Sequence, residues 1–216
     1  METELKLRFE HKDLLMSVVD EQWFKEILLP DDSGVLHLRN RYFDTKDFKF
    51  RLRNAVVRVR EVEDDAFIHT VKTSAGHADG LHQRFEWNCE CNLDEFDPAF
   101  FLGQASLGSD PVTILESVLE PALHDELICL FETVFTRTHM IGGYGNSIFE
   151  IALDYGDIIV GKKKEPICEM EIELLEGDVR DIIAVGEMVQ SHCRCSKENM
   201  SKYSRAIVML EAESEE

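Results

Sequence analysis

The sequence predicts an α+β domain in which eight strands are combined with helices at three places. Apolar and polar residues alternate with a period of two over eight segments, as in strands, and apolar residues recur at helical spacing between them. The chain has 216 residues, within the range of about 200–250 residues in which a β-barrel is built as one domain. No repeat or low-complexity linker divides it, so we expect a single domain over residues 1–216 with an acidic tail from about residue 211.

The predicted elements follow in order along the chain. Strands are expected at residues 2–9, 35–44, 55–62, 66–74, 81–91, 126–140, 147–160 and 165–175. Helical periodicity predicts an amphipathic helix over 11–28, two short helices between 93 and 123, and helices over 179–191 and 201–211. Turns are expected at 30–34, 63–65, 74–80 and 142–146, where Gly, Pro, Asn and Asp gather.

Charged residues on the predicted strands sort by sign. Glu2, Glu4 and Lys6 share one face of the first strand, because side chains two apart point the same way. The later strands carry Arg58 with Arg60, Lys72, Arg84 with Glu86, Arg137 with His139, Glu150 with Asp154, and Glu169 with Glu171 and Glu173. A half-exposed antiparallel sheet also alternates, so a solvated face explains each strand taken alone. Together, the cationic and anionic strands are what a polar lumen would need to hold a polyanion with metal ions.

Composition excludes several classes of function. The net charge of −20, from 43 acidic and 23 basic residues, argues against general nucleic-acid binding, which needs an extended basic face. No run of about 18 apolar residues occurs, so no membrane span is expected. The N-terminus lacks the features of a signal peptide, so we expect a cytoplasmic protein. The six cysteines lack zinc-site spacing and are expected to be reduced thiols.

Several motifs occur in an order typical of one family. They are Glu2-Thr3-Glu4-Leu5-Lys6, Tyr42-Phe43-Asp44-Thr45, the pair Arg58 and Arg60, Lys72, the run 80–86 and the run 165–174. Over nearly its whole length the chain resembles the CYTH, or triphosphate tunnel metalloenzyme, superfamily, and within it the bacterial inorganic triphosphatases. Those enzymes often carry a C-terminal CHAD domain of histidine-rich helices. A CHAD-type domain could therefore be present if the native chain is longer.

The resemblance implies a fold and an activity. The fold is a closed antiparallel β-barrel of eight strands with flanking helices, which forms a tunnel around a triphosphate. The activity is metal-dependent hydrolysis of tripolyphosphate to pyrophosphate and phosphate, with Mg²⁺ or Mn²⁺ as cofactor. The partner implied is a small-molecule triphosphate, without nucleic acid or membrane.

The resemblance also assigns roles to residues. Substrate phosphates would be bound by Lys6, Arg58, Arg60, Lys72, Arg84, Arg137 and Lys202. The metal ligands would be Glu2, Glu4, Glu169 and Glu171, and the catalytic residues would be Glu4, Glu171 and Lys202, the last on a mobile lid. Two interpretations stay open for Glu150, Asp154 and Glu173, which could position water or act as a base, or could pair with the arginines. Glu86 is expected to pair with Arg84.

Other functions remain open on the sequence. Class IV adenylyl cyclases and thiamine triphosphatases belong to the same superfamily and share most of the charged residues. A non-catalytic polyphosphate-binding module would use the same cationic strands. The two acidic Glu-x-Glu pairs argue against such a module, because a binder needs the cations more than the metal ligands.

Overall fold

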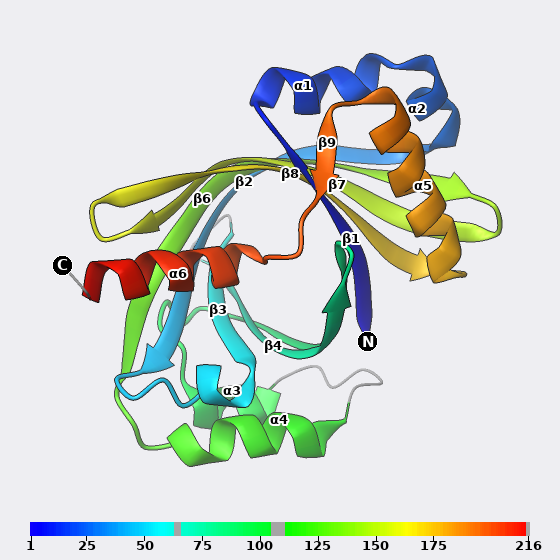
Figure 1. The fold of residues 1–216 in the computed structure, drawn as a ribbon. Coiled ribbons are helices and arrows are strands. Elements are labelled where there is room, and N and C mark those ends of the chain that lie inside the picture. The colour runs from blue at the N-terminus through cyan, green and yellow to red at the C-terminus, as the bar shows by residue number, and fades with distance from the viewer. Residues whose placement is uncertain (63–65, 105–110, 215–216) are drawn as a thin grey trace.

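The computed structural model describes residues 1–62, 66–104 and 111–214, and contains an antiparallel ring of strands (Figure 1). Nine strands form one sheet in the order β5-β4-β3-β2-β6-β7-β8-β1-β9. The first half of β1 also pairs with β5, from Glu2 opposite Arg84 to Leu5 opposite Leu81, which closes eight strands into a ring. The second half of the same β1 edge pairs with β9. The predicted eight-stranded antiparallel tunnel with flanking helices is confirmed.

The strands are β1 (Glu2–Phe9), β2 (Leu28–Thr45), β3 (Ala55–Glu61), β4 (Phe67–Ala78), β5 (Leu81–Cys91), β6 (Leu127–Tyr144), β7 (Ser147–Val160), β8 (Lys163–Glu176) and β9 (Cys195–Lys197). The α-helices are α1 (Lys12–Ser17), α2 (Gln22–Ile27), α3 (Pro98–Gln104), α4 (Val112–Leu119), α5 (Val179–His192) and α6 (Lys202–Ser214). Three short 3₁₀ turns complete the order: η1 (Val18–Asp20), η2 (Arg51–Arg53) and η3 (Glu120–Ala122). No helix in these described ranges is long and apolar enough to cross a membrane.

Several details of the prediction are wrong. The helix expected over 11–28 is divided by η1 into α1 and α2, and most of the turn expected at 142–146 belongs to β6, which continues to Tyr144. Residues 30–34 do not form the expected turn but belong to β2. The pairing of β2 with β6 shifts register between Leu28 and Ser33. Strand β4 continues to Ala78 through a second register shift, so the turn before β5 shrinks to Asp79 and Gly80, both at positive φ. Strand β9 was not expected, because three residues are too short for alternation to show. The turn expected at 63–65 lies outside the described residues.

Helices cover the outer faces of the ring and fill one of its ends. Helices α1 and α5 pack on β1, β7 and β8, and α2 packs on β6, around a core that includes Leu7 and Ile172. Helices α3 and α4 cover β3, β4 and β5 around the fully buried Trp87. Helix α6 lies across the ring opening in Figure 1, where Ala206 and Ile207 pack against apolar residues of β2, β6, β7 and β8. This packing places the N-terminus of α6 against the tunnel.

Candidate active site

The ring encloses a cavity of about 640 Å³ whose lining is rich in charge. It is lined by inward-facing residues of the strands and by the start of α6, as the period of two in each strand predicts. Of the residues singled out in the sequence, the cavity lining includes Glu2, Glu4, Lys6, Arg58, Arg60, Lys72, Arg84, Glu86, Arg137, Glu150, Glu171, Glu173 and Lys202. Asp154 and Glu169 are fully buried behind this lining.

The N-terminal motif forms one wall of the tunnel. Strand β1 runs beside β8, with Glu4 opposite Glu173 and Lys6 opposite Glu171. The Lys6 ammonium lies 2.6 Å from Glu171 and 3.4 Å from Glu4. Burial alone would lower the pKa of Lys6, but Glu171 and Glu4 outweigh that effect and raise it. Lys6 is therefore charged and held between two carboxylates.

The wall formed by β1, β4 and β5 contains further ion pairs. Arg84 contacts Glu4 at 2.9 Å. Lys72 contacts Glu2 at 2.9 Å and Glu86 at 2.6 Å. Glu86 was expected to pair with Arg84, and in the structure it contacts Lys72. Alternation identified the residues of this wall, while their pairing depends on the register between strands.

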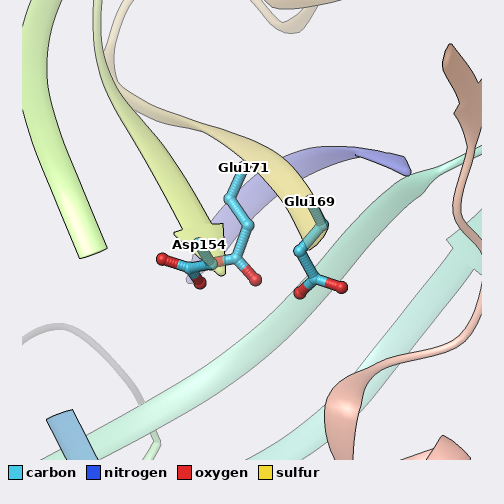
Figure 2. Close-up of side chains that lie close together, drawn as sticks. All are labelled: Asp154, Glu169 and Glu171. Carbon is cyan, nitrogen blue, oxygen red and sulfur yellow. The ribbon is translucent and has the colours of Figure 1, made fainter. Parts of the chain in front are cut away.

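Helix α6 inserts Lys202 into a cluster of three carboxylates. Figure 2 shows the cluster, formed by Asp154 on β7 and by Glu169 and Glu171 on β8, whose oxygens lie within 4.8 Å of one another. Lys202 contacts Asp154 at 2.8 Å, Glu171 at 3.0 Å and also Glu169. Burial opposes the charged form of Lys202, but the three carboxylates hold its pKa well above the ordinary value. With 7% exposure, Lys202 is not the exposed helix lysine that a surface helix would present.

Arg205 also belongs to this cluster, although the sequence did not predict it as a site residue. It lies one helical turn after Lys202 and is 3% exposed. Its guanidinium contacts Glu165 at 2.7 Å and Glu169 at 3.1 Å. The spacing of three residues from Lys202 is the signal that could have revealed it, because such residues share one helix face. Glu169 on β8 is thus held by two cations of α6, Lys202 and Arg205, whereas Glu2 and Glu4 lie on β1.

The opposite wall carries two arginines, Arg58 and Arg60, on β3. Among the described residues, neither Arg58 nor Arg60 makes an ion pair. Arg58 Nη2 donates to Thr70 Oγ1 at 3.0 Å, while its buried Nε has no partner in the described part of the chain. Arg60 Nε donates to Asn40 Oδ1 at 2.9 Å. Burial first, then the charge of Arg58, lowers the pKa of Arg60 to about 9. These two guanidiniums are suited to an anion.

Uncharged residues orient the two arginines. Thr70 donates in turn to Asn88 at 2.7 Å. Asn40, 1% exposed, donates to Thr133 at 2.9 Å while it accepts from Arg60. These residues are uncharged, so the alternation of charges along the strands does not identify them. Asn40 nevertheless shares the inward side of β2 with Tyr42 of the Tyr-Phe-Asp-Thr motif.

Carboxylates are in excess near the start of β1. Burial, and then the charge of Glu2, raises the pKa of Glu173 to about 8. Burial raises the pKa of Glu2 to about 6, against the lowering effect of Lys72. No ion pair of Glu173 occurs within the described ranges. Such clustered carboxylates match the hard oxygen ligands that Mg²⁺ and Mn²⁺ prefer, so this end of the tunnel fits a divalent cation.

The expected metal ligands do not form one group. The tight cluster joins Glu169 and Glu171 to Asp154, and Lys202 and Arg205 already neutralise it. Glu4 is joined to Glu171 through Lys6, which contacts both carboxylates, and Glu2 pairs with Lys72. Of the four expected ligands, the tight cluster therefore contains two, Glu169 and Glu171, while Glu2 and Glu4 lie on β1.

Comparison with known proteins identifies the family. The model of the CYTH domain matches residues 1–207. The chain belongs to the CYTH family. An inorganic triphosphatase of Haemophilus influenzae is 34% identical over 149 residues, which cover 68% of this chain and 38% of that protein. The CYTH chain thus spans well under half of the length of this relative.

Solved structures share the fold of this CYTH protein. A putative adenylyl cyclase from Hippeastrum, reported to have a dominant triphosphatase activity, matches with a TM-score of 0.62 and 17% identity, over 94% of both chains. A putative adenylate cyclase from Bacillus halodurans matches with a TM-score of 0.52 and 18% identity, over 95% of this chain and 98% of the other. At these identities the likeness concerns the fold, and the residues of the tunnel must carry any argument about activity.

Proposed function

We propose that the chain is a metal-dependent triphosphatase that hydrolyses inorganic tripolyphosphate to pyrophosphate and phosphate. The observation that carries this proposal is the pair of inward-facing arginines, Arg58 and Arg60, which make no ion pair in the described part of the chain and lie across the tunnel from an excess of carboxylates. The positive charge of Arg58 and Arg60 on one wall would be balanced by an anion. The excess of carboxylates on the other wall would be balanced by a cation. A triphosphate that carries a divalent ion supplies both.

The arginines would bind the phosphates. Guanidiniums form bidentate hydrogen bonds with phosphate oxygens, and the unpartnered Nε of Arg58 is free to join one. Lys6, Lys72, Arg84, Arg137 and Lys202 would add positive charge around the chain of phosphates. Because phosphoryl transfer depends mainly on positioning and charge stabilisation, no nucleophilic side chain is required. Water would attack the terminal phosphorus while the bridging P–O bond breaks and pyrophosphate leaves.

The carboxylates would have two separate tasks. Glu2 and Glu4, with Glu173 beside them, would hold Mg²⁺ or Mn²⁺, which when bound neutralises phosphate charge and activates water. Glu171 contacts Lys6, Arg137 and Lys202, and these cations, against the effect of burial, keep its pKa well below the ordinary value. Such a carboxylate is a poor proton acceptor, so we assign Glu171, with Asp154 and Glu169, to positioning the cations. Glu150 lines the same cavity and could orient water.

A substrate panel tests the proposal. Purified protein is incubated with tripolyphosphate, thiamine triphosphate, ATP or pyrophosphate, each with Mg²⁺, Mn²⁺ or EDTA. We expect phosphate release from tripolyphosphate, with either metal, at the highest kcat/KM of the panel. Cyclic AMP formed from ATP, without phosphate release from tripolyphosphate, would assign the chain to the cyclases instead. Tight tripolyphosphate binding without any turnover would favour a binding module.

A further inference from the structure

A second cavity of about 340 Å³ adjoins the tunnel beside the N-terminus of α6. It lies between the segment of η2 and β3, the hairpin of β4 and β5, and residues 199–204. Five residues line both cavities: Val56, Lys72, Arg84, Ser201 and Tyr203. The two spaces are therefore neighbours that share a boundary.

The described lining of this second cavity contains no Asp or Glu, although the chain has 43 acidic residues. Its charged and titratable side chains are Arg51, Lys72, His77, His82 and Arg84. The other polar groups are the side chains of Asn54, Ser74, Asn199, Ser201, Tyr203 and Ser204. A lining that has cations and neutral hydrogen-bonding groups but no carboxylates is suited to an anion.

The carboxylates that neutralise these cations lie outside the second cavity. Those of Lys72 are Glu2 and Glu86, which line the tunnel. Arg51 pairs with Glu211, on α6. The cavity thus borders the cations without containing their partners.

Arg84 lies between the two cavities. On the tunnel side Arg84 Nη1 donates to Glu4 at 2.9 Å. Its Nη2 lies 3.2 Å from His82 Nδ1, and His82 Nε2 lies 3.0 Å from the carbonyl of Glu198. His82 therefore donates through Nε2 and accepts from Arg84 through Nδ1. Burial and the charge of Lys6 lower the pKa of His82 to about 4, so the ring is neutral at pH 7.

The inward-facing rows of two strands connect the cavities. On β3 the row runs from Arg60 and Arg58 in the tunnel to Val56, which lines both cavities. On β4 it runs from Thr70 through Lys72 to Ser74 in the second cavity. A linear anion held at Arg58 can extend along these rows into the second cavity, whose described lining has no carboxylate.

We propose that the second cavity binds phosphate groups beyond the third of a linear inorganic polyphosphate, so that tetrapolyphosphate and longer chains are ligands of this protein. The proposal rests on the proposed function, because it assumes that three phosphates occupy the tunnel. The bond that is cleaved does not change. The same phosphate chemistry has a second possible source, the orthophosphate that hydrolysis releases.

The test compares chain lengths in a variant that alters only the second cavity. Arg51→Gln combined with His77→Gln changes two residues that line it without lining the tunnel. Arg53→Gln is the matched control, since Arg53 belongs to the same exposed turn and lines neither cavity. Thermal unfolding checks that each variant folds. Isothermal titration calorimetry in EDTA measures binding of tripolyphosphate and tetrapolyphosphate without turnover, and KM values follow with Mg²⁺.

We expect the wild type and Arg53→Gln to bind tetrapolyphosphate about tenfold more tightly than tripolyphosphate, a factor equivalent to about 1.4 kcal/mol. The double variant should lose this ratio and keep its affinity for tripolyphosphate. Equal affinities for both chains in the wild type would overturn the proposal. If the double variant instead relieves inhibition by orthophosphate and leaves the ratio unchanged, the cavity binds the released product.

The outcomes also separate this proposal from the proposed function. A chain-length ratio without hydrolysis of tripolyphosphate would support the second cavity and refute the triphosphatase. Hydrolysis of tripolyphosphate without any effect of chain length, and without an altered response to orthophosphate, would support the triphosphatase and refute phosphate binding in the second cavity.

Discussion

Replacing Arg60 by Met should stabilise the protein while it weakens triphosphate binding. An ordinary arginine has a pKa above 12, whereas burial and the neighbouring cations lower that of Arg60 to about 9. About three pKa units at 1.36 kcal/mol each correspond to a cost of about 4 kcal/mol for the charged form. The substitution removes this cost, but Oδ1 of the buried Asn40 loses its donor, which costs about 1–3 kcal/mol.

The net expectation for Arg60→Met is a gain of about 1–3 kcal/mol in unfolding free energy. For a chain of this size this raises Tm by roughly 2–12 °C. Loss of a charge-assisted hydrogen bond to phosphate, about 1.5–3 kcal/mol, should weaken tripolyphosphate binding roughly 10- to 150-fold. Arg39→Met is the control, because Arg39 is an exposed arginine paired with Glu132, and it should change stability by less than about 0.5 kcal/mol.

Thermal unfolding and calorimetric titration with tripolyphosphate measure both effects. A variant that melts below the wild type would show that Arg60 is already neutralised in the folded protein. A variant that binds tripolyphosphate as the wild type does would remove Arg60 from the phosphate site. Either result refutes the reasoning that assigns an anion to the cationic wall.

Three further predictions concern Glu4, Lys202 and Glu173, which line the tunnel. Glu4→Gln should lower metal-dependent hydrolysis at least about 100-fold with the fold intact by circular dichroism, and a near-normal rate would remove Glu4 from the metal site. Lys202→Met removes the cation that contacts Asp154, Glu169 and Glu171 together and leaves this buried cluster short of positive charge. It should cost about 3–5 kcal/mol in urea unfolding, the opposite sign to Arg60→Met, and unchanged stability would mean that the cluster is hydrated. Glu173, with its pKa raised to about 8, binds a proton in the folded state that the unfolded chain has lost, so stability should fall as pH rises from about 5 to 8. Glu173→Gln should flatten this slope in urea midpoints at pH 5.5, 7 and 8.5, and an unchanged slope would exclude Glu173 as its source.

Much of the tunnel could be predicted from the sequence because a strand has a strict period of two. The period places Glu2, Glu4 and Lys6 on one face, and Arg58 with Arg60 on another. It does not say which face points inward. That depends on closure of the ring between β1 and β5, a contact between residues about 80 positions apart, and in this chain the family motifs supplied it.

The ion pairs could not be predicted because they depend on tertiary contacts. Glu169 has the same alternation as Glu171 and Glu173, yet α6 brings Lys202 and Arg205 against it. No pattern within β8 contains this information. Neutral residues such as Asn40 and Thr70 are equally hidden, because only the neighbouring arginines reveal their function.

The most direct test of the central claim is ³¹P NMR of tripolyphosphate incubated with the purified protein. The account predicts equal amounts of pyrophosphate and orthophosphate, which appear with Mg²⁺ or Mn²⁺ and not with EDTA. Tripolyphosphate that stays intact with either metal, under conditions where the protein is folded, would contradict it.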